Sequence, residues 1–208
     1  MSGGEKGIMM VVSAPSGTGK TTLCKELLRL YPLLRFSVSY TTRPPRPREI
    51  DGVDYRFVSP EEFAERDKQG EFIEKEEMFG HSYGTSRKDI EDILNDGGDV
   101  LIDVDTRGAK TLKEAWEEGV FIFILPPSHE VLRERLRRRG SEDESAIALR
   151  LSRAFDEIND NYWYDYVVFN DKLQNSVHIL QSIYVAEKNR RIRQLDKLAE
   201  VIRSQGGN

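Results

Sequence analysis

The chain has 208 residues, of which 38% are hydrophobic and 32% charged, and its formal net charge is −5 at pH 7. This length suits one compact unit rather than two ordinary domains with a linker, and the organised apolar share excludes wholesale disorder. The negative charge argues against binding nucleic acid over a broad surface, which needs an excess of positive charge, but allows a local basic pocket for a small anion.

The composition also limits the kinds of metal site and the cellular location that this protein can have. Cys24 is the single cysteine, so an intrachain disulfide and a cysteine zinc site are excluded, and we interpret it as buried packing. The three histidines are scattered without metal-ligand spacing. Residues 1–6 lack the apolar stretch of a signal peptide, and no run approaches the roughly 18 apolar residues of a membrane span. We therefore expect a cytoplasmic protein.

Strand-like and helix-like segments alternate along the chain, which is typical of an α/β fold with a mostly parallel central sheet. The first helix follows from the spacing of Leu23, Leu27 and Tyr31 and ends at Pro32. The tail from about 173 to 203 is helical in spacing, with a break that the pattern does not locate. Four short apolar runs predict strands buried on both faces, at residues 8–12, 100–102, 120–125 and 166–169.

Two stretches interrupt this alternation. Residues 40–87 open with a Pro/Arg-rich loop and contain a capping box at Ser59, with proline at the first helical position. Residues 126–161 are helical and rich in arginine. Ser128 is placed to cap the helix in this segment that runs through Val131, Leu132 and Leu136. We expect both to be mobile lobes added to the core. The alternative is ordinary α+β elaboration.

Residues 14–21 read Ala-Pro-Ser-Gly-Thr-Gly-Lys-Thr, between the first strand and the first helix. This is the phosphate-loop pattern, with alanine in place of its first glycine. Gly17 and Gly19 allow the backbone angles that point successive N–H groups into one concavity. Lys20 can then bridge the β- and γ-phosphates of a nucleotide, and Thr21 can ligate Mg²⁺. The loop predicts nucleotide binding without choosing between a GTPase, an ATPase and a small-molecule kinase.

Arg43 and Arg46 form the next informative pair, three residues apart and stiffened by the prolines between them. Such a fork suits a second phosphate group. Short motifs follow it at 54–57 (Asp-Tyr-x-Phe), 72–74 (Phe-Ile-Glu), 83–86 (Tyr-Gly-Thr-Ser), 103–108 (Asp-x-Asp-x-x-Gly) and 170–171 (Asn-Asp).

Together with the phosphate loop and Ser-x-x-x-Arg-x-x-Arg at 39–46, these motifs resemble the guanylate kinase family over nearly the whole chain. The resemblance implies the reaction ATP + GMP ⇌ ADP + GDP, with Mg²⁺, on a three-layer fold of the P-loop NTPase type. It implies a single domain, 1–208, with a GMP-binding lobe at about 40–87 and a lid over ATP at about 126–161. The core is then about 1–39, 88–125 and 162–208.

The resemblance also assigns the acceptor site, and the chemistry agrees. Guanine presents N1–H and its N2 amino group on one edge, both donors, and a carboxylate can accept from both. Adenine has an acceptor at N1, which would face carboxylate lone pairs. The GMP-phosphate ligands implied are Arg43, Arg46, Tyr55 and Tyr83, and the guanine-binding residues are Ser39, Glu74, Thr85 and Asp105.

The strand at 100–105 ends in two acids, as a Walker B element does. Asp103 is expected to face Mg²⁺ and Asp105 the acceptor, although both could instead be helix-capping residues. The family often has an aromatic residue and Gln where this chain has Thr106 and Arg107, which leaves the packing near the acceptor open.

The donor side is implied by the phosphate loop, the arginine-rich segment and the late Asn-Asp pair. Five of the seven residues 133–139 are arginine, and a solvated helix face accounts for several of them. The resemblance selects Arg139 and Arg150 as lid arginines that reach the ATP phosphates, and Arg135 and Asn170 as neighbours of adenine. The predicted catalytic set is Lys20, Arg43, Arg139 and Arg150; the ATP set is Ser16, Gly17, Thr18, Gly19, Lys20, Thr21, Thr22, Arg135 and Asn170; the metal ligands are Thr21 and Asp103.

Three other readings stay open on the sequence. A non-catalytic guanylate-kinase-like binding module shares the fold, but such modules tend to lose the phosphate loop that this chain retains. A second reading is a kinase for another nucleoside monophosphate. Glu74 and Asp105 argue against it, because they favour guanine as the base. A regulatory GTPase lacks support because no Asn-Lys-x-Asp motif is present, and Asn170-Asp171-Lys172 has the wrong order. Oligomeric state and the choice between GMP and dGMP are not indicated.

Overall fold

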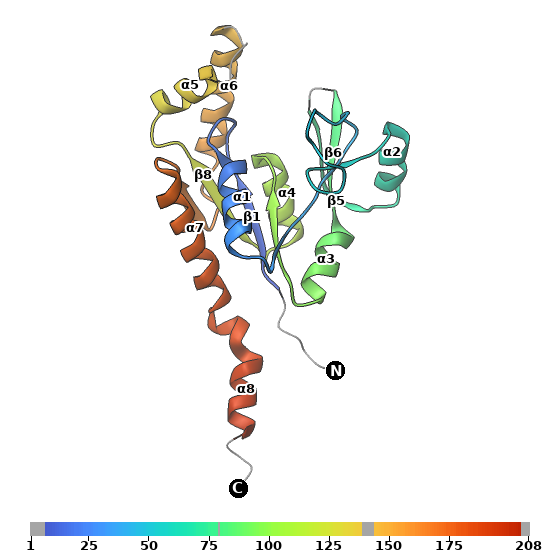
Figure 1. Cartoon of the computed structure of the whole chain (residues 1–208), viewed down its shortest axis with the longest axis vertical. Helices are drawn as coiled ribbons and strands as arrows, with labels where there is room; N and C mark the ends of the chain where they lie inside the picture. Colours follow the sequence, from blue (N-terminus) through green and yellow to red (C-terminus); the bar gives the residue numbers. More distant parts are fainter. Residues whose placement is uncertain (1–6, 79, 139–143, 205–208) are drawn as a thin grey trace.

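The computed structural model describes residues 7–78, 80–138 and 144–204. At its centre lies a parallel sheet that contains β1 and β8 (Figure 1). The sheet has five strands in the order β2-β7-β1-β8-β9. These strands are β1 (Met9–Ser13), β2 (Leu34–Phe36), β7 (Asp99–Asp103), β8 (Val120–Leu125) and β9 (Tyr166–Phe169). The predicted central parallel sheet is confirmed, and so are the four strands expected from the apolar runs.

Alternate residues of β1 enter two separate hydrophobic clusters, one on each face of the sheet, so the fold has three layers: helices, sheet and helices. Met10 and Val12 pack in the cluster that contains residues of α1 (Lys20–Leu30) and α7 (Leu173–Lys188). Met9 and Val11 pack on the other face, with residues of α3 (Arg87–Asn95) and α4 (Thr106–Ala115). Because both faces are covered, the strands are continuous apolar runs rather than alternating ones.

Strand β2 is an element that the sequence analysis did not predict. It has three residues, Leu34, Arg35 and Phe36, and pairs with the edge of β7. Arg35 is exposed, so the strand has neither an apolar run nor enough length for a period of two. Its pairing with β7, more than sixty residues later, forms the edge of the sheet.

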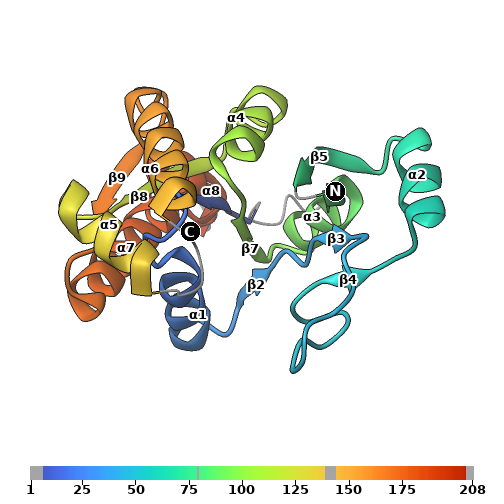
Figure 2. The ribbon, with the colours of Figure 1, turned by 90° about the horizontal axis from the view of Figure 1, so that it is seen from above.

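A second sheet, of four strands in the order β4-β3-β6-β5, lies to one side of the central sheet (Figure 2). Its elements are β3 (Tyr40–Thr41), β4 (Arg56–Phe57), α2 (Pro60–Lys68), β5 (Phe72–Met78) and β6 (His81–Ser86). Ser59 caps α2 by accepting from the Glu62 N–H at 3.1 Å, with Pro60 at the first helical position as predicted. Aromatic side chains fill this unit: the rings of Phe63 and Phe72 stack with their centroids 4.5 Å apart.

The arginine-rich segment forms two helices, α5 (His129–Arg138) and α6 (Glu144–Asn159). The Ser128 hydroxyl accepts from the Val131 N–H at 3.3 Å, as expected of a cap. Leu132 and Leu136 of α5 pack on Ile147 and Leu151 of α6 in a small core of their own.

The break in the C-terminal tail follows α7. A 3₁₀ turn, η1 (Arg191–Gln194), joins α7 to α8 (Leu195–Ser204), which extends away from the central sheet (Figure 1). Within the described ranges, no helix combines the length and the apolar character needed to cross a membrane.

Candidate functional site

The phosphate loop joins the buried strand β1 to the first turn of α1. Gly17 and Gly19 have φ angles of +92° and +94°, in the left-handed region that favours glycine. A Cβ on Gly19 would lie 2.6 Å from Nδ2 of Asn170, and one on Gly17 would lie 2.9 Å from Cδ2 of Leu136. Both positions therefore favour glycine, because of the positive φ angle and because a Cβ would lie too close to neighbouring side chains. The hydroxyl-bearing residues Ser16, Thr21 and Thr22 of the loop and helix are exposed.

Lys20 extends from the helix N-terminus to the end of strand β7. Its ammonium group forms an ion pair with the Asp103 carboxylate and donates to the carbonyl of Val104. The two side chains meet because β1 and β7 are neighbours in register, with Val12 opposite Asp103. The structure thus brings Lys20, predicted to bind phosphate, into contact with Asp103, predicted to bind the metal.

The donor set at this end of the sheet fits a nucleotide-borne Mg²⁺. Among the described residues, no cluster of three or more His, Cys, Asp or Glu could hold a metal ion. Mg²⁺ bound with a nucleotide needs only one or two protein ligands, since phosphates and waters supply the rest. The Asp103 carboxylate and the exposed Thr21 hydroxyl can provide them.

Arg135 and Asn170, which lie outside the phosphate loop, both donate hydrogen bonds to its backbone. The Arg135 guanidinium donates to the carbonyl of Thr18 at 3.1 Å and to that of Asn170 at 2.8 Å. The buried Asn170 amide donates to the same Thr18 carbonyl at 2.7 Å. The carbonyl of Thr18 is therefore held by two side chains from segments more than 100 residues away. Arg150 lies half-buried on α6, and Arg139 lies outside the described residues.

Arg43 is held by a residue that the sequence analysis missed. Its guanidinium donates to both carboxylate oxygens of Glu49, at 2.8 and 2.9 Å, and lies 5.3 Å from the centroid of the Tyr55 ring. Glu49 also accepts from the backbone N–H of Arg46 at 2.7 Å. The Arg46 N–H and the Arg43 guanidinium lower the pKa of Glu49. The turn that makes these contacts is not readable from residue types alone.

Two tyrosines stand beside Arg43. The rings of Tyr55 and Tyr83 lie edge to face with centroids 5.9 Å apart. Burial raises the pKa of Tyr55, which keeps its hydroxyl protonated and able to donate. Arg46 itself is exposed. The four residues predicted to bind the acceptor phosphate therefore occupy one region of the second sheet and its leading loop.

Glu74 is the most buried carboxylate of the second sheet, with 7% of its surface exposed. Thr85 lies opposite it in the β5–β6 pair and donates its hydroxyl to Glu74 Oε2 at 2.9 Å. Burial raises the pKa of Glu74 to about 7, and the nearby Asp105 adds to the rise while Thr85 opposes it. A Cβ on Gly108, at the start of α4, would lie 2.9 Å from Glu74 Oε1.

Asp105 lies at the start of α4 and caps it by accepting from the Gly108 N–H at 2.7 Å. The capping alternative raised from the sequence is thus realised for Asp105, and the same cap places its carboxylate beside Glu74. Ser39, at the entry to the second sheet, is half-buried, and its carbonyl accepts from the Arg56 N–H at 2.9 Å.

Two further carboxylates near Asp105 were not predicted. Burial, followed by a hydrogen bond with Asp105, raises the pKa of Glu76 to about 8. Burial, followed by the charge of Asp105, raises the pKa of Glu157 to about 7. Glu76 could have been inferred from strand alternation, since it lies two residues after Glu74. Glu157 comes from α6, and only the tertiary structure brings it near.

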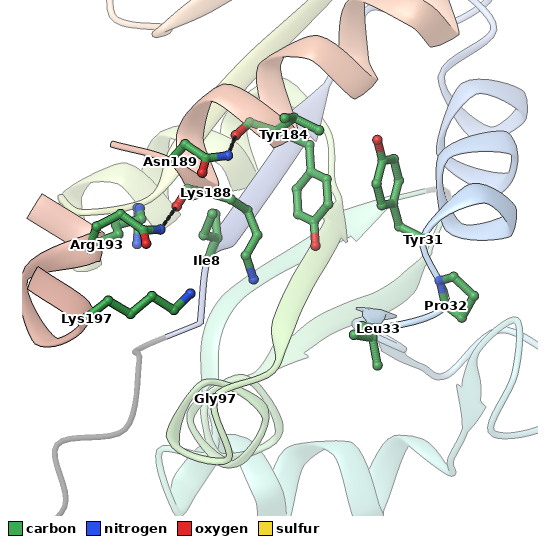
Figure 3. Close-up of a pocket in the computed structure, with 12 residues that line it drawn as sticks. Ile8, Tyr31, Pro32, Leu33, Gly97, Tyr184, Lys188, Asn189, Arg193 and Lys197 are labelled. Carbon is green, nitrogen blue, oxygen red and sulfur yellow. Dashed lines mark hydrogen bonds between the residues drawn. The ribbon is translucent and has the colours of Figure 1, made fainter. Parts of the chain in front are cut away.

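The cavity drawn in Figure 3 is at a different place. It has a volume of about 440 Å³ and is lined by Ile8, Tyr31, Tyr184, Lys188 and Lys197, among others. Ile8 immediately precedes β1, so this cavity lies at the amino ends of the strands, whereas the phosphate loop follows their carboxyl ends. Of the predicted site residues that the structure describes, none lines it.

Comparison with known proteins gives one consistent family. A family model described as guanylate kinase matches residues 6–187. The guanylate kinase of Geobacter metallireducens is 47% identical over 195 residues, covering 94% of this chain and 96% of that protein. The guanylate kinase of Syntrophus aciditrophicus is 48% identical over 200 residues, covering 96% of each. The crystal structure of guanylate kinase from Anaplasma phagocytophilum matches with a TM-score of 0.75 at 36% identity, covering 95% of both chains.

Proposed function

Because the chain belongs to the guanylate kinase family, we propose that it transfers the γ-phosphoryl group of ATP to GMP, giving ADP and GDP. The observation that supports the proposal is that two sets of predicted site residues are each brought together by the fold. Lys20 and Asp103 meet where the phosphate loop ends, and the buried Glu74 is held by Thr85 beside Asp105. The first set suits the phosphates of ATP, and the second suits the donor edge of guanine.

On the donor side, the phosphate loop binds the ATP phosphates through its backbone N–H groups and the N-terminus of α1. Lys20 neutralises charge between the β- and γ-phosphates. Thr21 and Asp103 would hold Mg²⁺, which supplies positive charge to the phosphate oxygens. Arg135 and Asn170 keep the loop in shape next to adenine, and the lid arginines Arg139 and Arg150 add charge at the phosphates.

On the acceptor side, Glu74 accepts from the guanine N1–H and N2 amino groups, with Thr85, Ser39 and Asp105 around it. Arg43 and Arg46 bind the GMP phosphate together with the hydroxyls of Tyr55 and Tyr83. For this, Arg43 exchanges one or both of its bonds with Glu49 for bonds to phosphate. Glu49 thus keeps the guanidinium oriented before GMP arrives.

The transfer needs no strong general base, because the attacking GMP phosphate oxygen is already anionic. Catalysis then comes from positioning the two phosphates in line and from neutralising charge by Lys20 and the arginines. Closure of the segments at 40–87 and 126–161 over the substrates would exclude water, which could otherwise hydrolyse ATP. We also propose a cytoplasmic location, where the nucleotides of purine metabolism are found.

A coupled ADP-release assay with MgATP tests the function directly. The acceptors to compare are GMP, dGMP, AMP, UMP and CMP, each at several concentrations. Turnover confined to GMP and dGMP is expected, because the other bases do not present two adjacent donors to Glu74. Folded protein that binds ATP but turns over AMP or UMP instead would overturn the choice of acceptor. Folded protein that turns over none of them would move the assignment to a non-catalytic binding module.

A further inference from the structure

Glu76 is a carboxyl group of the second sheet that the proposed transfer does not use. It lies two residues after Glu74 on β5, and the register of the β5–β6 pair is continuous between them. Residues two apart on a strand point to the same face of the sheet. Glu76 is half-buried, whereas its neighbours Lys75 and Glu77 are exposed. Glu76 therefore extends into the same space as Glu74, next to it along the strand.

The residues opposite Glu74 and Glu76 indicate which part of the acceptor lies over each. Thr85 lies opposite Glu74, and Tyr83 lies opposite Glu76. Opposite residues of an antiparallel pair share one face of the sheet. In the proposed function, Glu74 and Thr85 bind guanine, and Tyr83 binds the acceptor phosphate. The ribose joins these two parts of GMP, so it lies along the strand pair between them, within reach of Glu76.

The carboxyl group of Glu76 is turned toward the base side of this space. It shares a hydrogen bond with Asp105, which lies at the start of α4 and beside Glu74. The base is attached to C1′ of the ribose, and C2′ is bonded to C1′. The 2′-hydroxyl group is therefore the ribose donor nearest to guanine and to Asp105. A carboxyl group has two oxygens, so one can serve Asp105 while the other accepts from this hydroxyl group.

We propose, on the basis of the proposed function, that Glu76 accepts a hydrogen bond from the 2′-hydroxyl group of GMP and makes the chain prefer GMP to dGMP. Glu76 is then a specificity-determining residue of the acceptor site. The preference arises because dGMP has no donor at this position. Its binding would leave a half-buried oxygen of Glu76 without a partner, and an unpaired polar group is what makes a site reject an analogue that lacks a hydroxyl group.

The charges around Glu76 also call for a substrate contact. Burial raises the pKa of Glu76 to about 8, and the nearby charge of Arg107 opposes the rise. Within residues 7–78, 80–138 and 144–204, no three His, Cys, Asp or Glu side chains are placed to hold a metal ion, so metal binding does not account for this group of acids. A further acid beside an anionic substrate is unfavourable by charge alone, and a hydrogen bond to the ribose offsets that cost.

A structural role for Glu76 is the alternative, because its bond with Asp105 also joins β5 to the start of α4. The two roles predict different results. Loss of a structural bond would disturb the whole acceptor site and reduce the use of GMP and dGMP by the same factor. Loss of a contact with the 2′-hydroxyl group would reduce the use of GMP and leave that of dGMP unchanged.

Initial rates with MgATP and either GMP or dGMP give the ratio of the two kcat/KM values. In the wild type this ratio should be about tenfold in favour of GMP. Glu76→Leu has a side chain of similar size without an acceptor, and it should lower kcat/KM for GMP until the ratio is about one. Glu77→Leu, at the exposed next residue of the same strand, is the matched control and should keep the wild-type ratio. A wild-type ratio near unity, or a ratio that both variants change equally or leave unchanged, would overturn the proposal.

Glu76→Gln tests the hydrogen bond itself. The amide of glutamine can donate to Asp105, and its carbonyl oxygen can still accept from the 2′-hydroxyl group. This variant should therefore retain most of the wild-type preference for GMP. A ratio as low as that of Glu76→Leu would contradict a hydrogen bond accepted by this side chain.

The acceptor 3′-deoxy-GMP tests which hydroxyl group is recognised. It keeps the 2′-hydroxyl group, so Glu76→Leu should lower its kcat/KM by the same factor as that of GMP. If Glu76→Leu lowered the use of dGMP and left that of 3′-deoxy-GMP unchanged, Glu76 would contact the 3′-hydroxyl group, and the proposed basis for preferring GMP to dGMP would be wrong.

Failure of this inference differs from failure of the proposed function. Folded wild-type protein that turns over neither GMP nor dGMP would overturn the proposed function, and the role of Glu76 would fall with it. Wild-type protein that uses GMP and dGMP equally well would retain the proposed function and overturn only the role of Glu76.

Discussion

The central sheet and the second sheet place functional residues in two different ways. In the central sheet, β1 and β8 are buried along their whole length, and the phosphate loop depends on backbone angles at Gly17 and Gly19. In the second sheet, buried positions alternate with half-buried and exposed ones along the strands, and the site depends on individual side chains such as Glu74 and Arg43. A rigid buried sheet can aim a loop at phosphate, which every nucleotide carries. Distinguishing one base from another requires particular acceptors and donors, and an open sheet with polar side chains can present them.

The comparison predicts that the largest single effect lies at the central sheet. Lys20→Ala removes the side chain that we propose neutralises the transferring phosphate, and turnover should fall by about 10³-fold or more. The fold should persist, since Lys20 lies at a partly open helix end. Steady-state assays with MgATP and GMP measure the loss, and circular dichroism checks the fold. The exposed Lys25 of the same helix is the control, because Lys25→Ala should be near wild type. Near-normal turnover of Lys20→Ala would remove Lys20 from the mechanism.

A change in the second sheet should act on the acceptor alone. Glu74→Gln replaces one carboxylate oxygen by an amide donor, which in the proposed complex would face the guanine donors, and a lost hydrogen bond to a charged group is worth about 1.5–3 kcal/mol. We expect kcat/KM for GMP to fall between about tenfold and somewhat over a hundredfold, with KM for ATP unchanged. Glu77→Gln, at an exposed position of the same strand, is the control. If KM for ATP rose together with that for GMP, the two sites would not be separable as described.

Gly19→Ala tests whether the loop depends on space as well as on backbone angle. A Cβ there meets Asn170 Nδ2 at 2.6 Å, in addition to the strain of a φ of +94°. Gly80→Ala carries the strain without the contact, since φ is +75° and, among the described residues beyond its chain neighbours, none lies within 4 Å of a Cβ built there. Both variants should lose about 1–2 kcal/mol of stability from the angle. Only Gly19→Ala should also raise KM for ATP, by about tenfold. Thermal unfolding and ATP titrations measure the two effects, and equal KM values for both variants would exclude the Asn170 contact as a cause.

The pH dependence of GMP use sharpens the role of burial at Glu74. The pKa of Glu74 is raised to about 7, chiefly by burial, and only the ionised form accepts both guanine donors. Lowering the pH from 7.5 to 6 reduces the ionised fraction about eightfold, so kcat/KM for GMP should fall by about that factor. Glu74→Gln should lack this part of the profile, which separates it from titration of the GMP phosphate. Profiles of equal steepness in both proteins would assign the titration elsewhere.

The same raised pKa has a consequence for stability. Between the ordinary carboxyl pKa and about 7, the unfolded chain has lost the Glu74 proton while the folded chain retains it. The folded state therefore binds more protons in this window, and the contribution of Glu74 to stability falls as pH rises through it. Glu74→Gln should lose this slope, which thermal unfolding across pH 4.5–7 would show.

Much of the central sheet could be predicted from local residue patterns. The strands at β1, β7, β8 and β9 are apolar because both faces are covered, so their burial is visible in the sequence itself. The phosphate loop is readable because its glycines and Lys20 are contiguous. The short strand β2 escaped prediction, since three residues with an exposed arginine carry no period.

The second sheet shows why the rest was not readable without a resemblance. Strands β3 and β4 have two residues each, too few for any pattern, and β3 pairs with residues as far as 44 positions away, as Tyr40 does with Gly84. The pairing of Arg43 with Glu49 depends on a turn in which Arg48 has a φ of +80°, and residue types alone do not imply it.

The sequence by itself determined the parallel core and the nucleotide loop, because these depend on contiguous residues and on burial, whereas the acceptor residues were predicted only through the family resemblance. The tertiary structure alone decided which carboxylates lie together. Glu74 comes from β5, Asp105 from the start of α4 and Glu157 from α6, and their closeness depends on how three elements pack. Desolvation and mutual charge are properties of that packing, so the raised pKa values appear only once the chain has folded.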